Sequence, residues 1–135
     1  VGDGPARRQL ERQLPRASFL GFQDGRDLSA TFASLDLFVH TGAHETFCQA
    51  AQEALASGVP VIGPAAGGLL DLVQAGHNGL CFEPGSSGDL ARCVEELQRD
   101  EWARRHMSAH ARRSVLGRTW DVIGDELMQH YREVA

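Results

Sequence analysis

Two acidic side chains eight positions apart are the residues whose types and spacing suggest chemistry. Glu45 and Glu53 stand at the ends of the run Glu45-Thr46-Phe47-Cys48-Gln49-Ala50-Ala51-Gln52-Glu53, which follows the apolar stretch 37–40. If this run is helical, eight residues rise about 12 Å, and both carboxylates lie along one flank with Gln49 between them. Two carboxyl groups that hydrolyse one bond lie roughly 5 to 9.5 Å apart. The pair is therefore too widely spaced for hydrolysis, and it suits the two hydroxyl-bearing ends of one long ligand, such as a nucleotide sugar.

A structural explanation of the same residues also exists. An acid in the first turn of a helix is favoured by the helix dipole, and an exposed Glu further along is an ordinary surface residue. Position favours function, because the predicted helix follows a strand of parallel type. Ligands of open α/β sheets bind outside the carboxyl ends of such strands.

The composition excludes several classes of protein. The chain has 135 residues, 42% of them hydrophobic, and a net charge of −5, which predict one globular domain that binds no nucleic acid. Its 13 basic residues are all Arg, so Schiff-base chemistry and a phosphate-loop lysine are excluded. No apolar run is long enough to span a bilayer, and Cys48, Cys81 and Cys93 show no disulfide-like spacing. We therefore expect a soluble protein of the cytoplasm.

Strand and helix patterns alternate along the chain. The predicted strands are 19–22, 37–39, 59–62 and 80–82, and the predicted helices are 5–14, 27–34, 46–57, 69–75, several from Asp89 onward, and 120–134. Such alternation with short connections predicts an α/β fold, a doubly wound parallel sheet with C-terminal helices. In this fold the loops 21–23, 40–45 and 63–71 gather at one edge of the sheet, where the start of helix 46–57 offers an anion site.

The motif Glu45-x7-Glu53, joined to Ala54-Leu55-Ala56-Ser57-Gly58-Val59-Pro60-Val61 and then to Gly67-Gly68, resembles the family 4 glycosyltransferases. Further signposts are Val1-Gly2-Asp3-Gly4-Pro5, Phe19-Leu20-Gly21-Phe22 and Gly76-x-Asn78-Gly79-Leu80-x-Phe82-x-Pro84-Gly85, so the likeness covers nearly the whole chain. The resemblance implies the C-terminal, donor-binding, Rossmann-like half of a two-domain GT-B enzyme that transfers a hexose with retention of configuration. Residues 1–135 would then be a single nucleotide-sugar-binding domain from a longer chain, without its first strand–helix unit and inactive in isolation. Helix 120–134 would contact the N-terminal domain of that longer chain.

The resemblance also implies roles for individual residues. Glu45 would contact the donor hexose and assist catalysis, and Glu53 would hold the ribose hydroxyls. Thr46 also belongs to the implied substrate-binding set, and Phe47 and Cys48 would bind the sugar through their backbone amides. Gln49 would reach the sugar or the phosphate. Gly21, Phe22 and Gln23 would lie near the base. No cofactor and no metal are implied, because basic side chains and helix-end amides neutralise the phosphates.

The sequence also departs from the pattern of the family. Thr46 and Cys48 replace small residues that are commonly Gly, and the donor-phosphate Arg and Lys of the family would precede Val1. Diphosphate binding by these residues alone should therefore be weak. The variant of the motif is most similar to actinobacterial mannosyltransferases that use GDP-mannose and lipid-linked acceptors, which implies a peripheral contact with the membrane in the longer enzyme.

Three other interpretations compete with this one. His40, His44, Glu45 and Cys48 are all potential metal ligands, but their spacing matches no metalloprotease or zinc motif, and His40 is expected to be a hydrogen-bonded histidine at a strand end. Cys48 as a nucleophile lacks an identifiable base. The third is a non-catalytic module that binds a nucleotide or a nucleotide sugar.

Overall fold

A computed structural model describes residues 1–134, and inter-residue contacts divide the chain into two compact units. The first comprises residues 1–31, and the second begins at Phe32. Within residues 1–134, none of the helices combines the length and the apolarity needed to cross a lipid bilayer. The single nucleotide-sugar-binding domain over 1–135 and the role of helix 120–134 stay predictions.

The first unit contains helix α1 (Arg7–Gln13) and most of helix α2 (Gly25–Ala33). Residues 18–21 have no regular secondary structure, so the prediction of a strand at 19–22 is wrong. A strand needs a hydrogen-bonded ladder, and this segment has one backbone bond to the start of the chain, from Gly2 N–H to Gly21 O at 2.7 Å. The Arg7 guanidinium reinforces the same loop by donating to Phe19 O at 3.2 Å.

The second unit is built on a parallel sheet of three strands in the order β1 (Phe38–Val39), β2 (Val61–Pro64), β3 (Gly79–Phe82). The register pairs Phe38 with Val61 and Ile62 with Leu80. All four residues of β2 are buried, as expected of a central parallel strand covered on both faces. The prediction of an α/β doubly wound parallel sheet with C-terminal helices is confirmed.

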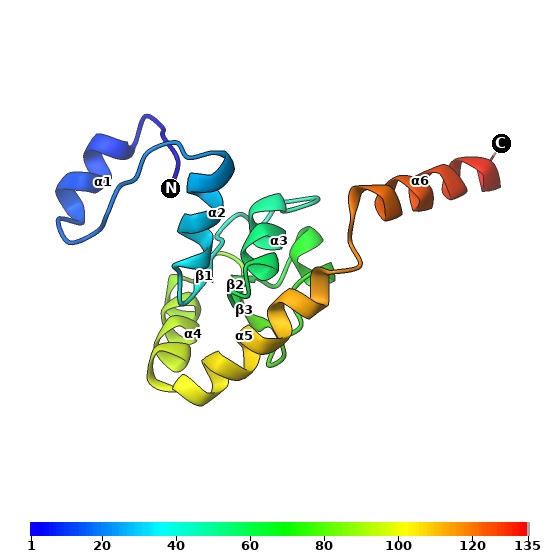
Figure 1. Ribbon diagram of the computed structural model, residues 1–135. Helices are drawn as coiled ribbons and strands as arrows, with labels where there is room; N and C mark the ends of the chain where they lie inside the picture. Colours follow the sequence, from blue (N-terminus) through cyan, green and yellow to red (C-terminus); the bar gives the residue numbers. More distant parts are fainter. Residues whose placement is uncertain (135) are drawn as a thin grey trace. The chain divides into compact units, whose positions relative to one another are not determined.

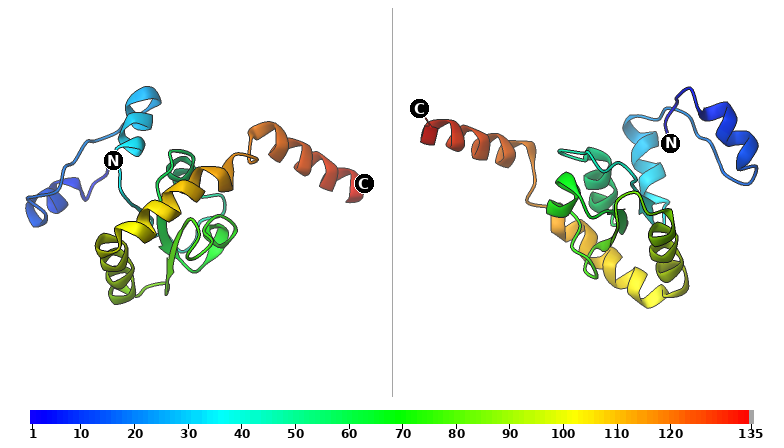
Figure 2. Two further views of the ribbon diagram at one scale, coloured as in Figure 1. Left: turned by 60° about the horizontal axis from the view of Figure 1, so that its bottom comes forward. Right: turned by 180° about the vertical axis from the view of Figure 1, so that it is seen from behind.

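Helices enclose the short strands of this unit (Figure 1). The enclosing helices are α3 (Gln49–Ala56), the 3-10 helix η1 (Gly67–Asp71), α4 (Ser87–Arg99) and α5 (Glu101–Val115), whereas α6 (Trp120–Val134) follows α5 and does not cover the strands. Helix α5 packs against both α3 and α4, and it crosses in front of the sheet in the left view of Figure 2. The core cluster joins β2, β3, α4 and α5 through Ile62, Phe82, Cys93, Leu97 and Met107.

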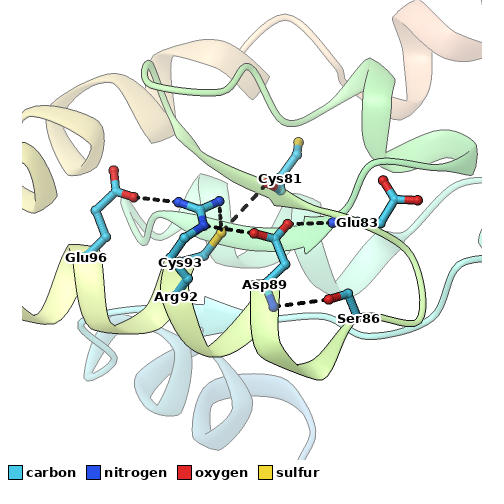
Figure 3. A network of polar contacts seen from close by, with 7 residues as sticks. All are labelled: Cys81, Glu83, Ser86, Asp89, Arg92, Cys93 and Glu96. Atoms are coloured by element: carbon cyan, nitrogen blue, oxygen red, sulfur yellow. Dashed lines mark hydrogen bonds and ion pairs between the residues drawn. The ribbon is translucent and has the colours of Figure 1, made fainter.

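A polar network connects the end of β3 to the start of α4 (Figure 3). Ser86 caps α4 by accepting a hydrogen bond from Asp89 N–H at 3.2 Å, and Asp89 in turn accepts from Glu83 N–H at 2.8 Å. The Arg92 guanidinium donates to the other Asp89 oxygen at 2.8 Å. The Glu83 amide, followed by Arg92, lowers the pKa of Asp89 below its usual value. This network fixes where the chain leaves the sheet.

Asn78 is a fully buried polar side chain that anchors the turn before β3. Its amide donates to Leu72 O at 2.8 Å and to Ser114 Oγ of α5 at 2.9 Å, while its carbonyl oxygen accepts from Gln74 N–H at 2.8 Å. Every polar atom of this amide group therefore has a partner, as burial requires. The turn is thereby held on helix α5.

The loops that follow β1 and β2 are pressed together backbone to backbone. Gly68 N–H donates to Glu45 O at 2.8 Å. A Cβ added to Gly67 would lie 2.6 Å from the same oxygen, and one added to Gly68 would collide with Thr46 O. Gly67 has a φ of +58°, which favours glycine independently of space. Only glycine at 67 and 68 allows these loops to meet.

Several predicted elements differ from the structure in their bounds. Strand 59–62 is displaced to 61–64, and helix 69–75 is instead the 3-10 helix at 67–71. Helix 46–57 is wrong at its start, because α3 begins at Gln49. Trp102 and Trp120 are 75% and 69% exposed, although aromatic residues at helical spacing generally pack in a core.

Replacing Asn78 with Ala should strongly destabilise the fold. The change leaves Gln74 N–H, Leu72 O and Ser114 Oγ without their partner, at about 1–3 kcal/mol for each buried group that stays unpaired. We expect a lower midpoint in urea unfolding, with a loss of about 3 kcal/mol or more in the free energy of unfolding. Ser114→Ala removes one of these bonds and should cost about a third as much. Equal losses in both variants would contradict the anchoring role of Asn78.

Replacing Gly68 with Ala should separate the two loops. The new methyl group collides with the Thr46 carbonyl, so the Glu45 segment must move or the protein must lose about 1–3 kcal/mol of stability. Gly88 on α4 has no atom within 4 Å of an added Cβ, so Gly88→Ala is the matched control and should stabilise slightly. Amide spectra of residues 42–47 report the movement, and unchanged spectra together with unchanged stability would contradict it.

Candidate functional site

The segment Glu45–Cys48 forms a loop rather than the first turn of a helix. Cys48 is the residue before α3, and its backbone is left-handed, with φ 48° and ψ 57°. It is the one non-glycine residue of the described chain with a positive φ. A left-handed residue interrupts a right-handed helix, so α3 cannot extend back to Glu45. The prediction that Glu45 and Glu53 line one flank of one helix is therefore wrong, because only Glu53 is on α3.

Glu45 belongs to a compact group with His40 and Cys48. His40 Nε2 lies 3.7 Å from Glu45 Oε1, and potential ligand atoms of all three residues lie within 4.8 Å of one another. The loop folds back and brings together side chains whose linear spacing matches no metal motif. Burial is the main cause that raises the pKa of the Cys48 thiol, and the charge of Glu45 raises it further. Cys48 is thus held as a neutral thiol, which disfavours it as a nucleophile.

His40 has an unexpected environment. Its Nε2 is a buried nitrogen without a hydrogen-bond partner, although the sequence suggests a fully hydrogen-bonded histidine at a strand end. That expectation is wrong because Nε2 faces the Glu45 carboxylate at 3.7 Å, which is beyond hydrogen-bond distance. A buried nitrogen left without a partner marks a place where a polar ligand atom is favoured.

Glu53, Gln49 and Phe47 border a separate pocket of about 220 Å³. Gln49 Nε2 donates to Glu53 Oε1 at 3.3 Å, so the two polar side chains act together. The Phe47 ring stacks on Trp120, with centroids 5.5 Å apart and planes at 21°. The pocket is completed by Gln52, Ala56, Val115, Arg118, Trp120 and Ile123.

The sequence analysis did not identify Gln52, Arg118 and Trp120, which line the pocket. Arg118 Nε donates to Gln52 Oε1 at 3.4 Å, and Gln52 Nε2 donates to Phe47 O at 3.0 Å. This chain of bonds holds the segment between α5 and α6 against the Glu45–Cys48 loop. Gln52 lies three residues after Gln49 on α3, a helical spacing that could have indicated it. No sequence signal places Arg118 or Trp120 here, since they lie 66 and 73 positions after Gln52 and Phe47.

The loop 21–23 belongs to the first compact unit. Gly21 has a φ of +73°, Gln23 Nε2 donates to Leu20 O at 3.1 Å, and the Phe22 ring is 75% exposed. This loop is therefore built by its own unit. The structure brings Glu45 and Thr46 together at Gly67-Gly68, with Cys48 beside Glu45. It brings Phe47, Gln49 and Glu53 together around the pocket.

The amino end of α3 lies between these two groups. Cys48 offers no side-chain cap to this end. The first amides of a helix point out of its amino end, and uncapped they form an anion site with the positive end of the helix dipole. This arrangement can bind a ligand with hydroxyl groups at its ends and negative charge in its middle.

The chain has well-matched relatives. The family described as glycosyl transferases group 1 matches residues 1–114. GDP-mannose-dependent alpha-mannosyltransferases of Mycolicibacterium smegmatis and Mycobacterium tuberculosis are 50% identical over 135 residues and 48% identical over 139 residues. Each alignment covers 99% of this chain and 35% of the relative, so the chain spans about a third of the length of these relatives.

Solved structures agree with the fold. Sucrose-phosphate synthase from Thermosynechococcus elongatus superposes with a TM-score of 0.83 at 28% identity, over 97% of this chain and 35% of that one. Anabaena HepE in complex with UDP-glucose superposes with a TM-score of 0.79, also at 28% identity, over 100% of this chain and 40% of that one. The predicted resemblance to family 4 glycosyltransferases of GT-B fold, with mannosyltransferase relatives, is confirmed. This chain belongs to the glycosyl transferases group 1 family.

Proposed function

We propose that this chain is the donor-binding part of a retaining hexosyltransferase that uses a nucleotide-diphospho-sugar, with GDP-mannose favoured, and transfers the sugar to a hydroxyl acceptor. The observation that carries the proposal is the contact of the Glu45–Thr46 backbone with Gly67-Gly68, which holds the Glu45 loop beside the uncapped end of α3. Mannosyltransferase relatives at 46–50% identity support mannose as the hexose and GDP as the carrier.

The three parts of a donor match three features of the site. The diphosphate carries the negative charge that the amino end of α3 favours. Glu45 and the unpaired His40 Nε2 lie together on one side of this helix end, where they can hold hexose hydroxyls. Glu53, one helical turn beyond Gln49, accepts hydrogen bonds from the ribose.

Phe22 is the residue proposed to contact the nucleotide base of the donor. A guanine needs a flat apolar surface, and base–aromatic stacking contributes about 1–3 kcal/mol. The 75% exposed ring of Phe22 provides such a surface, flanked by Gly21 and Gln23. Loop 21–23 is thus proposed to contact the base, as the family resemblance implies.

Transfer is proposed to need no metal. Burial raises the pKa of Cys48, so a metal ion would have to displace the thiol proton at a greater cost in free energy. The group of His40, Glu45 and Cys48 is therefore better suited to hydrogen bonding than to a metal. Helix-end amides and basic side chains neutralise the diphosphate instead.

The remaining proposals concern the full-length protein. The exposed apolar side chains of α6 suit a contact with an N-terminal domain; they are Trp120, Val122, Leu127, Met128 and Tyr131. The acceptor is proposed to be linked to a lipid. The protein itself is proposed to lie in the cytoplasm, at the periphery of the membrane. Residues 1–135 alone are expected to perform no transfer, because acceptor binding and the basic phosphate contacts require residues outside them.

Substituting the two glutamates in the full-length protein should separate catalysis from donor binding. Glu45→Ala removes a group at the transferred hexose and should lower kcat by about 100-fold or more. Glu53→Ala removes ribose contacts and should chiefly raise the donor KM, by about tenfold or more. Glu95→Ala, which removes an exposed carboxylate of α4, is the matched control and should change neither constant. Undiminished rates in both variants would refute these roles.

Titration of the chain with GDP, UDP and ADP, followed by amide spectra, tests the donor class. We expect GDP to shift resonances of residues 21–23 and 42–53 at lower concentration than UDP or ADP, and GDP-mannose to add shifts near Glu45. Binding of all three nucleotides with no added effect of the sugar would favour a non-catalytic nucleotide-binding module. Shifts confined to other residues would refute the site.

A further inference from the structure

Three imidazole rings gather on the surface of α5, outside the proposed donor site. His106 and His110 are one helical turn apart on α5, and His77 lies in the turn before β3. The ring centroids of His106 and His110 are 4.4 Å apart, and those of His77 and His110 are 4.2 Å apart. One ring nitrogen of each residue lies within 4.8 Å of the others. We call these three residues the histidine triplet.

The buried side chain of Asn78 positions this triplet. Asn78 directly follows His77, and its amide bonds to Ser114, one turn after His110 on the same helix. The next residue, Gly79, approaches Val61 so closely that no side chain fits. The backbone on the carboxyl side of His77 is thus held firmly on α5 and β2, which places the His77 ring over His110 without dependence on any ligand.

One ring of the triplet is also oriented for metal binding. His110 Nδ1 lies 2.8 Å from the backbone oxygen of His106. A carbonyl oxygen only accepts hydrogen bonds, so Nδ1 is the donor of this bond, and Nε2 is the ring nitrogen left to bind a metal ion. A hydrogen bond from the other ring nitrogen is the usual way in which a metal-binding histidine is oriented.

The ligand types of the histidine triplet favour a particular metal ion. Three imidazoles, with no carboxylate or thiol among them, suit Zn²⁺ with a water molecule as the fourth ligand. Zn–N bonds of about 2.0–2.1 Å place ligand nitrogens roughly 3.3 Å apart in a tetrahedron. The ligand nitrogens lie within 4.8 Å of one another, so they need to approach by about 1.5 Å at most. Rotation of the exposed side chains supplies this movement.

The triplet lies away from the proposed transfer chemistry. His77 precedes the amino end of β3, whereas the Glu45 and Gly67-Gly68 loops follow the carboxyl ends of β1 and β2. In a parallel sheet these are opposite edges. An ion at the triplet therefore does not meet the sugar donor.

We propose that His77, His106 and His110 form a surface Zn²⁺ site that ties the turn before β3 to α5. This inference goes beyond glycosyl transfer and does not depend on it. The ion crosslinks two segments that are 29 or more positions apart in sequence, so it stabilises the folded state by RT ln(1 + c/Kd), where c is the free Zn²⁺ concentration and Kd is the dissociation constant of the site.

Calorimetric titration of the full-length protein with ZnCl₂ tests the site. The protein is prepared without a polyhistidine tag and stripped of metal with a chelator. We expect one equivalent to bind at the triplet, at least tenfold more weakly in His110→Ala and in His77→Gln. His130→Ala on α6 removes an exposed histidine outside the triplet and should bind Zn²⁺ unchanged. Equal unfolding midpoints of all variants without zinc exclude a folding defect.

Trp102 provides a second readout of the same site. Its ring stacks on His106, with centroids 5.3 Å apart and planes at 15°. Co²⁺, a paramagnetic substitute for Zn²⁺, should quench its fluorescence, and Trp102→Phe should abolish most of the quenching without weakening Co²⁺ binding.

Two outcomes would overturn the proposal. The first is unchanged Zn²⁺ affinity in both His110→Ala and His77→Gln. The second is loss of binding in Cys48→Ser together with an intense thiolate-to-Co²⁺ absorption band, which would assign the ion to His40, Glu45 and Cys48.

Discussion

The contact between two loop backbones is the constraint on which the candidate site depends. Gly68 N–H bonds to Glu45 O, and the missing side chains of Gly67 and Gly68 leave room for the carbonyls of Glu45 and Thr46. A loop after a parallel strand has no ladder of its own to hold it. Here the backbone of the neighbouring loop replaces that ladder, so the Glu45 segment has a defined place beside α3.

The left-handed backbone of Cys48 follows from this constraint. The chain must leave the glycine contact and enter α3 within four residues, and a residue with φ 48° makes the change of direction. For a side chain other than glycine this conformation is unfavourable, by about 1–3 kcal/mol, and such strain gathers at functional sites. The same turn buries the Cys48 thiol, raises its pKa and brings it next to His40 and Glu45.

Sequence reasoning reached the fold class, the strands β1 to β3 within two residues, and the loops after β1 and β2. These follow from apolar runs, glycine signals and alternation, which are local properties of the chain. It misplaced the start of α3, because the helical period of Phe47, Ala50 and Ala54 says nothing of a backbone reversal at Cys48. The exposure of Trp102 and Trp120 could not be predicted either, because helical spacing does not say which face of a helix finds a partner.

Residue types and their order alone thus determined an α/β domain of a glycosyltransferase family with acidic residues near a strand end, because periodicity and motif spacing are written in neighbouring positions. Only the tertiary structure decided that Glu45 joins His40 and Cys48 while Glu53 joins Arg118 and Trp120 around a pocket. It alone also brought His77 onto His110. The reason is physical: these partners are separated by up to 73 positions, and their meeting depends on how helices pack on the sheet and on buried hydrogen bonds such as that from Asn78 to Ser114.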